Sequence, residues 1–189
     1  KKYLFHLDQL AGILESCRND YKVLTIREER YSHYETHYFD TPDLKMYIQH
    51  HNGKLNRHKV RYRKYVDSGL CFFEIKFKTN KGRTIKDRVK VKELQSTIFG
   101  APEQLLIRKT SFEPSALLES LEVRYNRITL VNKNLSERVT IDVKLSYSNP
   151  DVACSFPSLV IAEVKQEKTT RSPIITLFQE RSIHPYSIS

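Results

Sequence analysis

The sequence predicts an α+β or closed β architecture of about eight or nine largely antiparallel strands with three or four short helices. Three observations support this fold class. Segments of alternating polar and apolar residues recur along the chain, turn sequences such as Asp67-Ser68-Gly69 separate them, and helical spacing of apolar residues is confined to short stretches. A length of 189 residues suits one domain with a sizeable core, and we expect a single domain over 1–189.

Strands are expected wherever apolar residues alternate with polar ones between turn signals. The expected ranges are 2–6, 21–26, 35–39, 55–65, 70–78, 83–91, 121–131, 137–147 and 158–167. A turn at Asn80-Lys81-Gly82 separates two of the central strands. Their number and short spacing favour hairpin-like, antiparallel pairing.

Helices are expected at four places. Asp8 can cap the first one, whose apolar residues at helical spacing are Leu10, Ile13 and Leu14. Pro42 fits the first turn of the second, and its expected buried stripe is Leu44, Tyr47 and Ile48. A short helix should follow Pro114, and a last helix should start at Pro173.

The chain is strongly basic, with 32 Lys and Arg against 22 Asp and Glu and a net charge of +10. This balance favours an anionic partner, such as nucleic acid, a membrane surface or phosphate-rich small molecules; the alternative is a solvated basic surface. The three cysteines show no metal-binding spacing, which favours reduced thiols and a cytoplasmic location. No apolar run approaches the roughly 20 residues that span a bilayer.

Most of the basic residues share one side of the expected strands. In the segment RHKVRYRKY, Lys59, Arg61 and Arg63 alternate with apolar or aromatic residues, and CFFEIKFK repeats the pattern. The basic residues on the polar parity are Lys59, Arg61, Arg63, Lys76, Lys78, Lys86, Arg88, Arg127, Arg138, Lys144 and Lys165. The carboxylates on that parity are Glu74, Asp142, Glu163 and Glu167. A solvated sheet should mix the two signs more evenly, so this excess predicts a bound polyanion.

Two geometries would present such a face. An open basic sheet would suit nucleic acid, but such sheets usually add exposed aromatics for base stacking, and the aromatics here lie mostly on the apolar parity. A closed barrel of eight strands with the charged side inward would hold a narrow chain of phosphates. Carboxylates among the basic residues could hold a divalent metal together with phosphate.

The order of the motifs resembles the VTC domain, the polyphosphate polymerase domain of the vacuolar transporter chaperone, in its bacterial single-domain form. This family belongs to the triphosphate tunnel metalloenzyme, or CYTH-like, group. The motifs are YFDTPDLKMY, HKVRYRKY, FFEIKFKTNKGRTIKDR, VRYNR, RVTID and VIAEVK. The resemblance implies a closed antiparallel β-barrel tunnel with short flanking helices, and a C-terminal end that is truncated before a further lysine.

The resemblance also implies the reaction and its residues. The γ-phosphate of ATP would be transferred to a polyphosphate or triphosphate chain with Mn²⁺ or Mg²⁺. The residues that it implies for catalysis are Lys59, Arg61, Lys76, Lys86 and Arg127. The further residues expected to bind phosphate are Lys2, Arg63, Lys78, Arg88, Arg138 and Lys165. Glu163 is expected to hold the metal, with Glu74 or Asp142 nearby. The alternative is that Glu74 and Glu163 form structural ion pairs with the basic residues.

Other functions stay open at this point. A tunnel hydrolase would use the same residues with water as the acceptor. A non-catalytic sensor of polyphosphate or inositol phosphate would bind without turnover. A nucleic-acid-binding module is the third alternative, although no nucleic acid is expected. A membrane partner that receives the product is compatible with the family but is not encoded in these residues.

Overall fold

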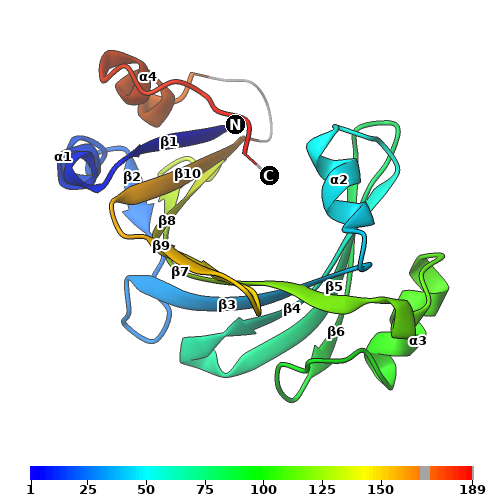
Figure 1. The fold of residues 1–189 in the computed structure, drawn as a ribbon. Helices are drawn as coiled ribbons and strands as arrows, with labels where there is room; N and C mark the ends of the chain where they lie inside the picture. The colour runs from blue at the N-terminus through cyan, green and yellow to red at the C-terminus, as the bar shows by residue number, and fades with distance from the viewer. Residues whose placement is uncertain (167–170, 189) are drawn as a thin grey trace. The chain divides into compact units, whose positions relative to one another are not determined.

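The computed structural model describes residues 1–166 and 171–188 (Figure 1). The strands are β1 (Lys2–His6), β2 (Tyr21–Val23), β3 (Tyr31–Asp40), β4 (Arg57–Tyr65), β5 (Leu70–Lys78), β6 (Thr84–Val91), β7 (Leu118–Asn132), β8 (Glu137–Ser148), β9 (Ala153–Phe156) and β10 (Leu159–Gln166). The α-helices are α1 (Leu10–Ser16), α2 (Lys45–His51), α3 (Ala101–Lys109) and α4 (Pro173–Glu180). The α+β class is therefore confirmed.

The strands form one hydrogen-bonded sheet in the order β1-β10-β8-β7-β3-β4-β5-β6, with β2 paired to β7 and β9 paired to β8. Where the register is described, every pairing is antiparallel. Strands β1 and β6 end this order, and within the described residues no pairing joins them. A large antiparallel sheet is therefore confirmed, whereas closure into a barrel by hydrogen bonds is not.

The residues pack into two units. Unit 1 comprises Lys1–His33, Arg124–Ser146 and Cys154–Ile188, and unit 2 comprises Tyr34–Val123 and Tyr147–Ala153. Each unit has its own cluster of buried apolar side chains. The assignment of 1–189 to a single domain stays a prediction.

The core of unit 1 lies between helices α1 and α4 and the strands β1, β8 and β10. Alternation along β1 buries Tyr3 and Phe5, and both rings contact Phe178 of α4, with the Tyr3 and Phe178 centroids 4.7 Å apart. Ile13 of α1 and Ile174 of α4 are fully buried in the same cluster. Burial of one such side chain contributes about 1.5–3 kcal/mol, so these contacts hold both helices to the sheet.

The core of unit 2 lies on one side of β4 and β5. Val60 and Tyr62 of β4 and Phe73 of β5 are fully buried there. Helix α3 packs Leu105 and Leu106 into the same cluster. Because side chains alternate along a strand, burying these residues directs their neighbours Lys59, Arg61, Glu74 and Lys76 to the other side of the sheet.

The expected buried stripe of the second helix is wrong. Tyr47 is 54% and Ile48 48% exposed, Leu44 is also exposed, and the buried residue of α2 is Met46. The reason lies at the start of the helix, because Leu44 takes a left-handed conformation with a φ of 52°. The Asp40 carboxylate then accepts the backbone N–H groups of Met46 and Tyr47 at 2.9 and 2.8 Å. This cap turns Met46 toward the core.

The predicted ends of the other helices and strands agree with the structure in some places and differ in others. The strand at Lys2–His6 and the helix start at Pro173 are confirmed. Asp8 is not a cap, because a 3₁₀ turn precedes α1 and the helix begins at Leu10. Helix α3 and strand β9 were not predicted, and in place of the short helix expected after Pro114 there is a 3₁₀ turn. Glu167, which was assigned to the polar parity, lies outside the described residues.

Within residues 1–166 and 171–188, no helix has the length and apolar character needed to cross a membrane.

Candidate functional site

The register of unit 2 gathers basic side chains from three adjacent strands on one side of the sheet. Lys59 of β4 lies opposite Lys76 of β5, which lies opposite Lys86 of β6, so three lysines form a row. We call this side the basic face of unit 2, and its predicted members are Lys59, Arg61, Arg63, Lys76, Lys78, Lys86 and Arg88. Like charges directly opposite each other are destabilising, so the row favours a bound anion.

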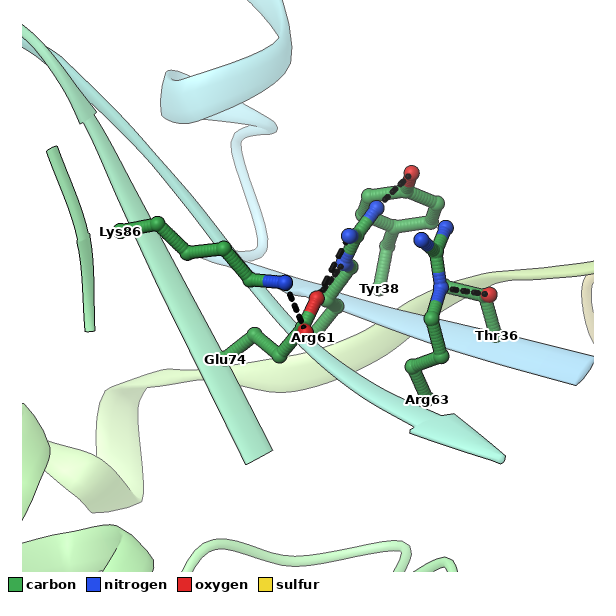
Figure 2. Close-up of polar contacts among 6 residues, drawn as sticks. All are labelled: Thr36, Tyr38, Arg61, Arg63, Glu74 and Lys86. Atoms are coloured by element: carbon green, nitrogen blue, oxygen red, sulfur yellow. Dashed lines mark hydrogen bonds and ion pairs between the residues drawn. The ribbon is translucent and has the colours of Figure 1, made fainter. Parts of the chain in front are cut away.

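Glu74 of β5 is the carboxylate within the basic face (Figure 2). Its buried side chain accepts hydrogen bonds from Nε and Nη2 of Arg61 at 2.8 and 2.5 Å. Its other oxygen, Oε1, is paired with the ammonium group of Lys86. Burial raises the pKa of the carboxyl group, but the charges of Arg61 and Lys86 outweigh burial and lower the pKa of Glu74 to about 2. Glu74 is therefore ionised at neutral pH and fixes the positions of two cations.

Strand β3 supplies polar partners that the sequence analysis missed. Arg61 donates from Nη1 to the Tyr38 hydroxyl at 3.1 Å, and Arg63 donates from Nε to Oγ1 of Thr36 at 3.1 Å (Figure 2). Burial raises the pKa of Tyr38, but Arg61 and Arg63 outweigh it, so the pKa is lowered. Alternation in YETHYFD could have placed Thr36 and Tyr38 on one side, but the register with β4 could not be predicted.

Lys76 of β5 shows that positive charge is in surplus on the basic face. Within the described residues, no carboxylate forms an ion pair with its ammonium group. Burial, followed by the charges of Arg61 and Arg63, lowers the pKa of Lys76 to about 7. A bound polyanion would favour the protonated amine, so this part of the face is suited to a group that carries several negative charges.

The basic face also includes Arg57 and Lys90, which were not predicted. Arg57 lies opposite Lys78, and Lys90 lies opposite Phe72. The guanidinium carbon of Arg88 lies 4.5 Å from the centroid of the Phe72 ring. The two-residue period of their own strands was a signal that could have identified both residues. Their positions extend the basic face toward the ends of β4 and β6.

Unit 1 has a smaller polar face of its own on β1, β10 and β8. Lys2 lies opposite Glu163, which lies opposite Thr140, and Lys165 lies opposite Arg138. The ammonium group of Lys165 is 3.5 Å from Glu163, and that of Lys2 donates to the carbonyl of Ile188 at 2.9 Å. The register therefore brings together four predicted residues, namely Lys2, Arg138, Glu163 and Lys165.

Arg127 of β7 is held by a bidentate ion pair within unit 1. Its Nε and Nη2 atoms donate to the two oxygens of Asp142 at 2.6 and 2.7 Å. The guanidinium also lies 5.0 Å from the centroid of Tyr125. Farther along β8, Lys144 has a φ of 52°, which interrupts the regular alternation that was expected there.

The two glutamates expected to hold a metal differ in what surrounds them. Mg²⁺ and Mn²⁺ at phosphate sites typically use one or two carboxylates together with phosphate oxygens and water. The Glu163 side chain is 34% exposed beside basic residues, which suits this chemistry. Both oxygens of Glu74 are engaged by Arg61 and Lys86, so Glu74 could bind a metal only if these pairs changed. Both metal assignments stay predictions, as do the catalytic and phosphate-binding roles.

Comparison with solved structures defines the class of fold. A candidate adenylate cyclase from Vibrio parahaemolyticus matches with a TM-score of 0.55 at 11% identity, over 99% of this chain and 93% of that chain. A candidate adenylyl cyclase from Hippeastrum with a dominant triphosphatase activity matches with a TM-score of 0.50 at 11% identity, over 96% and 87%. The PH1819 protein from Pyrococcus horikoshii gives 0.51 at 12% identity, over 97% and 88%. The chain therefore shares the overall fold of these proteins.

The sequence itself identifies the family. The VTC domain profile matches residues 1–189, and the chain belongs to the VTC domain family. The resemblance stated from the motifs is thereby confirmed. No curated protein matches the chain by sequence.

Proposed function

We propose that this chain is a metal-dependent phosphotransferase that moves the γ-phosphate of ATP onto a polyphosphate or triphosphate chain. The observation that carries the proposal is the surplus of positive charge around Lys76, which lies in one row with Lys59 and Lys86. Membership of the VTC domain family supports the same reaction class. The closed tunnel and the cytoplasmic location remain parts of the proposal, and the three free cysteines support the latter.

Phosphoryl transfer depends mainly on positioning and on neutralising charge. In the proposed reaction, the bond between the γ-phosphorus and the β–γ bridging oxygen breaks, and a terminal phosphate oxygen of the acceptor forms the new bond. ADP leaves with the bridging oxygen, and no general base is required because the acceptor is already an anion. Mn²⁺ or Mg²⁺ would neutralise phosphate charge, with Glu163 as the residue best suited to hold it.

The residues of the basic face would bind and orient the phosphates. Arg61 is fixed by Glu74 and Tyr38, so it can offer a guanidinium edge in a set direction. Lys59, Lys76 and Lys86 would act as point charges along the phosphate chain. Arg127 belongs to unit 1 and is not part of the basic face; it would have a phosphate-binding role of its own, through the donors that do not contact Asp142.

A tunnel triphosphatase is the second candidate function. The Hippeastrum protein with a similar fold has a dominant triphosphatase activity. That reaction needs the same cationic contacts to the phosphates, with water as the acceptor. Incubation with ATP and Mn²⁺ or Mg²⁺ tests the first proposal, because long-chain polyphosphate supports a polymerase. Release of orthophosphate alone, from ATP or from tripolyphosphate, would support the triphosphatase instead. Binding of tripolyphosphate without turnover would indicate a sensor.

Two variants connect either activity to the basic face. Replacement of Lys76 by Met should weaken tripolyphosphate binding about tenfold or more, because a charge in contact with phosphate is lost. Lys22→Gln is the matched control, since Lys22 is an exposed lysine on β2, outside the basic face. Equal effects of the two substitutions would argue against the basic face as the phosphate site. RNA binding that outcompetes tripolyphosphate would instead favour a nucleic-acid-binding module.

A further inference from the structure

A second group of chemically reactive side chains lies in unit 2, on β3 and β7. One nitrogen of His37, one carboxylate oxygen of Glu35 and one of Glu122 all lie within 4.8 Å of one another. Glu35 and His37 have the opposite parity on β3 from Thr36 and Tyr38, which contact the basic face. The group is therefore separate from the proposed phosphate site.

The two nitrogens of His37 face different carboxylates. Nε2 lies 3.4 Å from Oε1 of Glu35, and Nδ1 lies 2.9 Å from Oε1 of Glu119. Two ligands bound about 2.1 Å from a tetrahedral Zn²⁺ ion are separated by about 3.4 Å. The spacing between His37 and Glu35 thus matches that of two ligands of one ion.

Glu119 is the carboxylate beside the second ring nitrogen of His37. A metal-bound histidine usually gives its other ring N–H to a carboxylate, which fixes the tautomer and the orientation of the ring. Nδ1 of His37 is buried and lies 2.9 Å from Oε1 of Glu119 without the alignment of a hydrogen bond, so the ring would have to reorient for Nδ1–H to donate to Glu119 and leave the lone pair of Nε2 toward Glu35 and Glu122. The side chains are only partly exposed, at 16% for His37, 20% for Glu35 and 30% for Glu119.

The surroundings also suit an ion. Ser148 of β8 donates to Oε2 of Glu122 at 3.2 Å, which orients that carboxylate. A cavity of about 350 Å³ borders Glu119, Glu122 and Ser148. Lys64 lies opposite Glu35 in the β3–β4 pair and is the basic residue that the register places beside it.

We propose that Glu35, His37 and Glu122 bind a divalent transition-metal ion of the Zn²⁺ type, with Glu119 as the positioning residue. One imidazole and two carboxylates favour Zn²⁺ over Mg²⁺ or Ca²⁺, which prefer ligand sets made of oxygen alone. Bound there, the ion would connect β3 to β7 within unit 2. This proposal does not depend on the phosphotransferase reaction.

The test uses calorimetric titration of the whole chain with Zn²⁺, and titration with Co²⁺ followed by its visible absorption. One bound ion per chain and the intense absorption bands of tetrahedral Co²⁺ are expected. His37→Ala should abolish both signals, and Glu122→Gln should weaken binding at least tenfold. Glu119→Gln should weaken binding about 10–100-fold while the Co²⁺ spectrum keeps its shape, because it removes only the group that orients His37.

His51→Ala is the matched control, since His51 is an exposed histidine of α2 in the same unit. It should leave the high-affinity Zn²⁺ binding unchanged. Circular dichroism shows whether each variant folds, and Glu122→Gln keeps the test valid if His37→Ala does not fold. Loss of binding in His51→Ala, or Zn²⁺ binding that survives His37→Ala and Glu122→Gln, would overturn the proposal. Absence of Zn²⁺ binding by the wild-type chain would show that His37 only forms ion pairs with its carboxylates.

Discussion

Replacement of Glu74 by Gln removes the negative charge that holds Arg61 and Lys86 on the basic face. The carboxyl group is fully buried, and its pKa is lowered from 4.5 to about 2. Such a shift corresponds to about 3 kcal/mol of stabilisation at neutral pH. Breaking a buried ion pair by removing one partner typically costs about 3–5 kcal/mol, which agrees with this value. We therefore expect Glu74→Gln to lower the free energy of unfolding by about 3 kcal/mol at pH 7.

The dependence on pH gives this prediction its sign. Because the folded-state pKa of Glu74 is below the unfolded value, its contribution is complete above about pH 4.5 and is lost as the pH falls toward about 2. Urea unfolding at a series of pH values measures it. The difference between wild type and Glu74→Gln should be largest at neutral pH and should shrink in acid.

Two further measurements show whether the charge of Glu74 is the cause. Glu113→Gln, at an exposed glutamate of unit 2, should change stability by less than about 0.5 kcal/mol. Tripolyphosphate should stabilise Glu74→Gln more than wild type, because a bound anion can replace the missing carboxylate. A destabilisation below about 1 kcal/mol, or one that stays constant from pH 7 to pH 2, would refute the reasoning.

Three other substitutions test further charged groups in the two units. Tripolyphosphate binding by wild type should weaken as the pH rises above about 7, because Lys76 then loses its proton. Isothermal titration should show a smaller dependence on pH for Lys76→Met. Tyr38→Phe should lower the free energy of unfolding in urea by about 1 kcal/mol, through loss of the hydrogen bond to Arg61. It should also remove a tyrosine whose pKa is below the usual value, as an ultraviolet titration will show. Arg127→Lys should lower the free energy of unfolding by about 1 kcal/mol, because lysine cannot form the bidentate pair with Asp142.

Each of these three predictions has a contrary outcome. An identical pH profile for wild type and Lys76→Met would show that Lys76 does not titrate near neutrality in the phosphate site. If the absorbance change that Tyr38→Phe removes falls at the pH of an ordinary tyrosine, the lowered pKa of Tyr38 is contradicted. Arg127→Lys as stable as wild type would mean that the bidentate geometry contributes little, with Arg124→Lys at an exposed position of β7 as the comparison.

The alternation of polar and apolar residues was enough to predict much of the sheet. In β4 and β5 it separated Lys59, Arg61 and Glu74 from Val60 and Tyr62 correctly, because this period is a local property of a strand. It could not show that Arg61 lies opposite Glu74, since register depends on pairing between segments far apart in sequence. For the same reason, the pairing of the two Glu74 oxygens with Arg61 and Lys86 could not be predicted.

Other features depended on details that periodicity does not contain. The left-handed conformation of Leu44 and the Asp40 cap together set which side of α2 is buried, so the helical spacing alone selected the wrong residues. The group around His37 joins β3 to a strand more than 80 positions later, and neither segment shows metal-binding spacing by itself. Such sites become visible only when the strand order is known.

The lowered pKa of Lys76 has a consequence for chemical reactivity. The pKa of Lys76 is lowered to about 7, so a larger share of its side chains carries a neutral amine at neutral pH than for ordinary lysines, which are almost fully protonated. A neutral amine is a nucleophile, so Lys76 should react with acylating reagents more readily than a protonated lysine of similar exposure. A bound phosphate chain would restore the proton and protect the residue. Covalent labelling followed by mass spectrometry could therefore report occupancy of the basic face directly, without an assay of turnover.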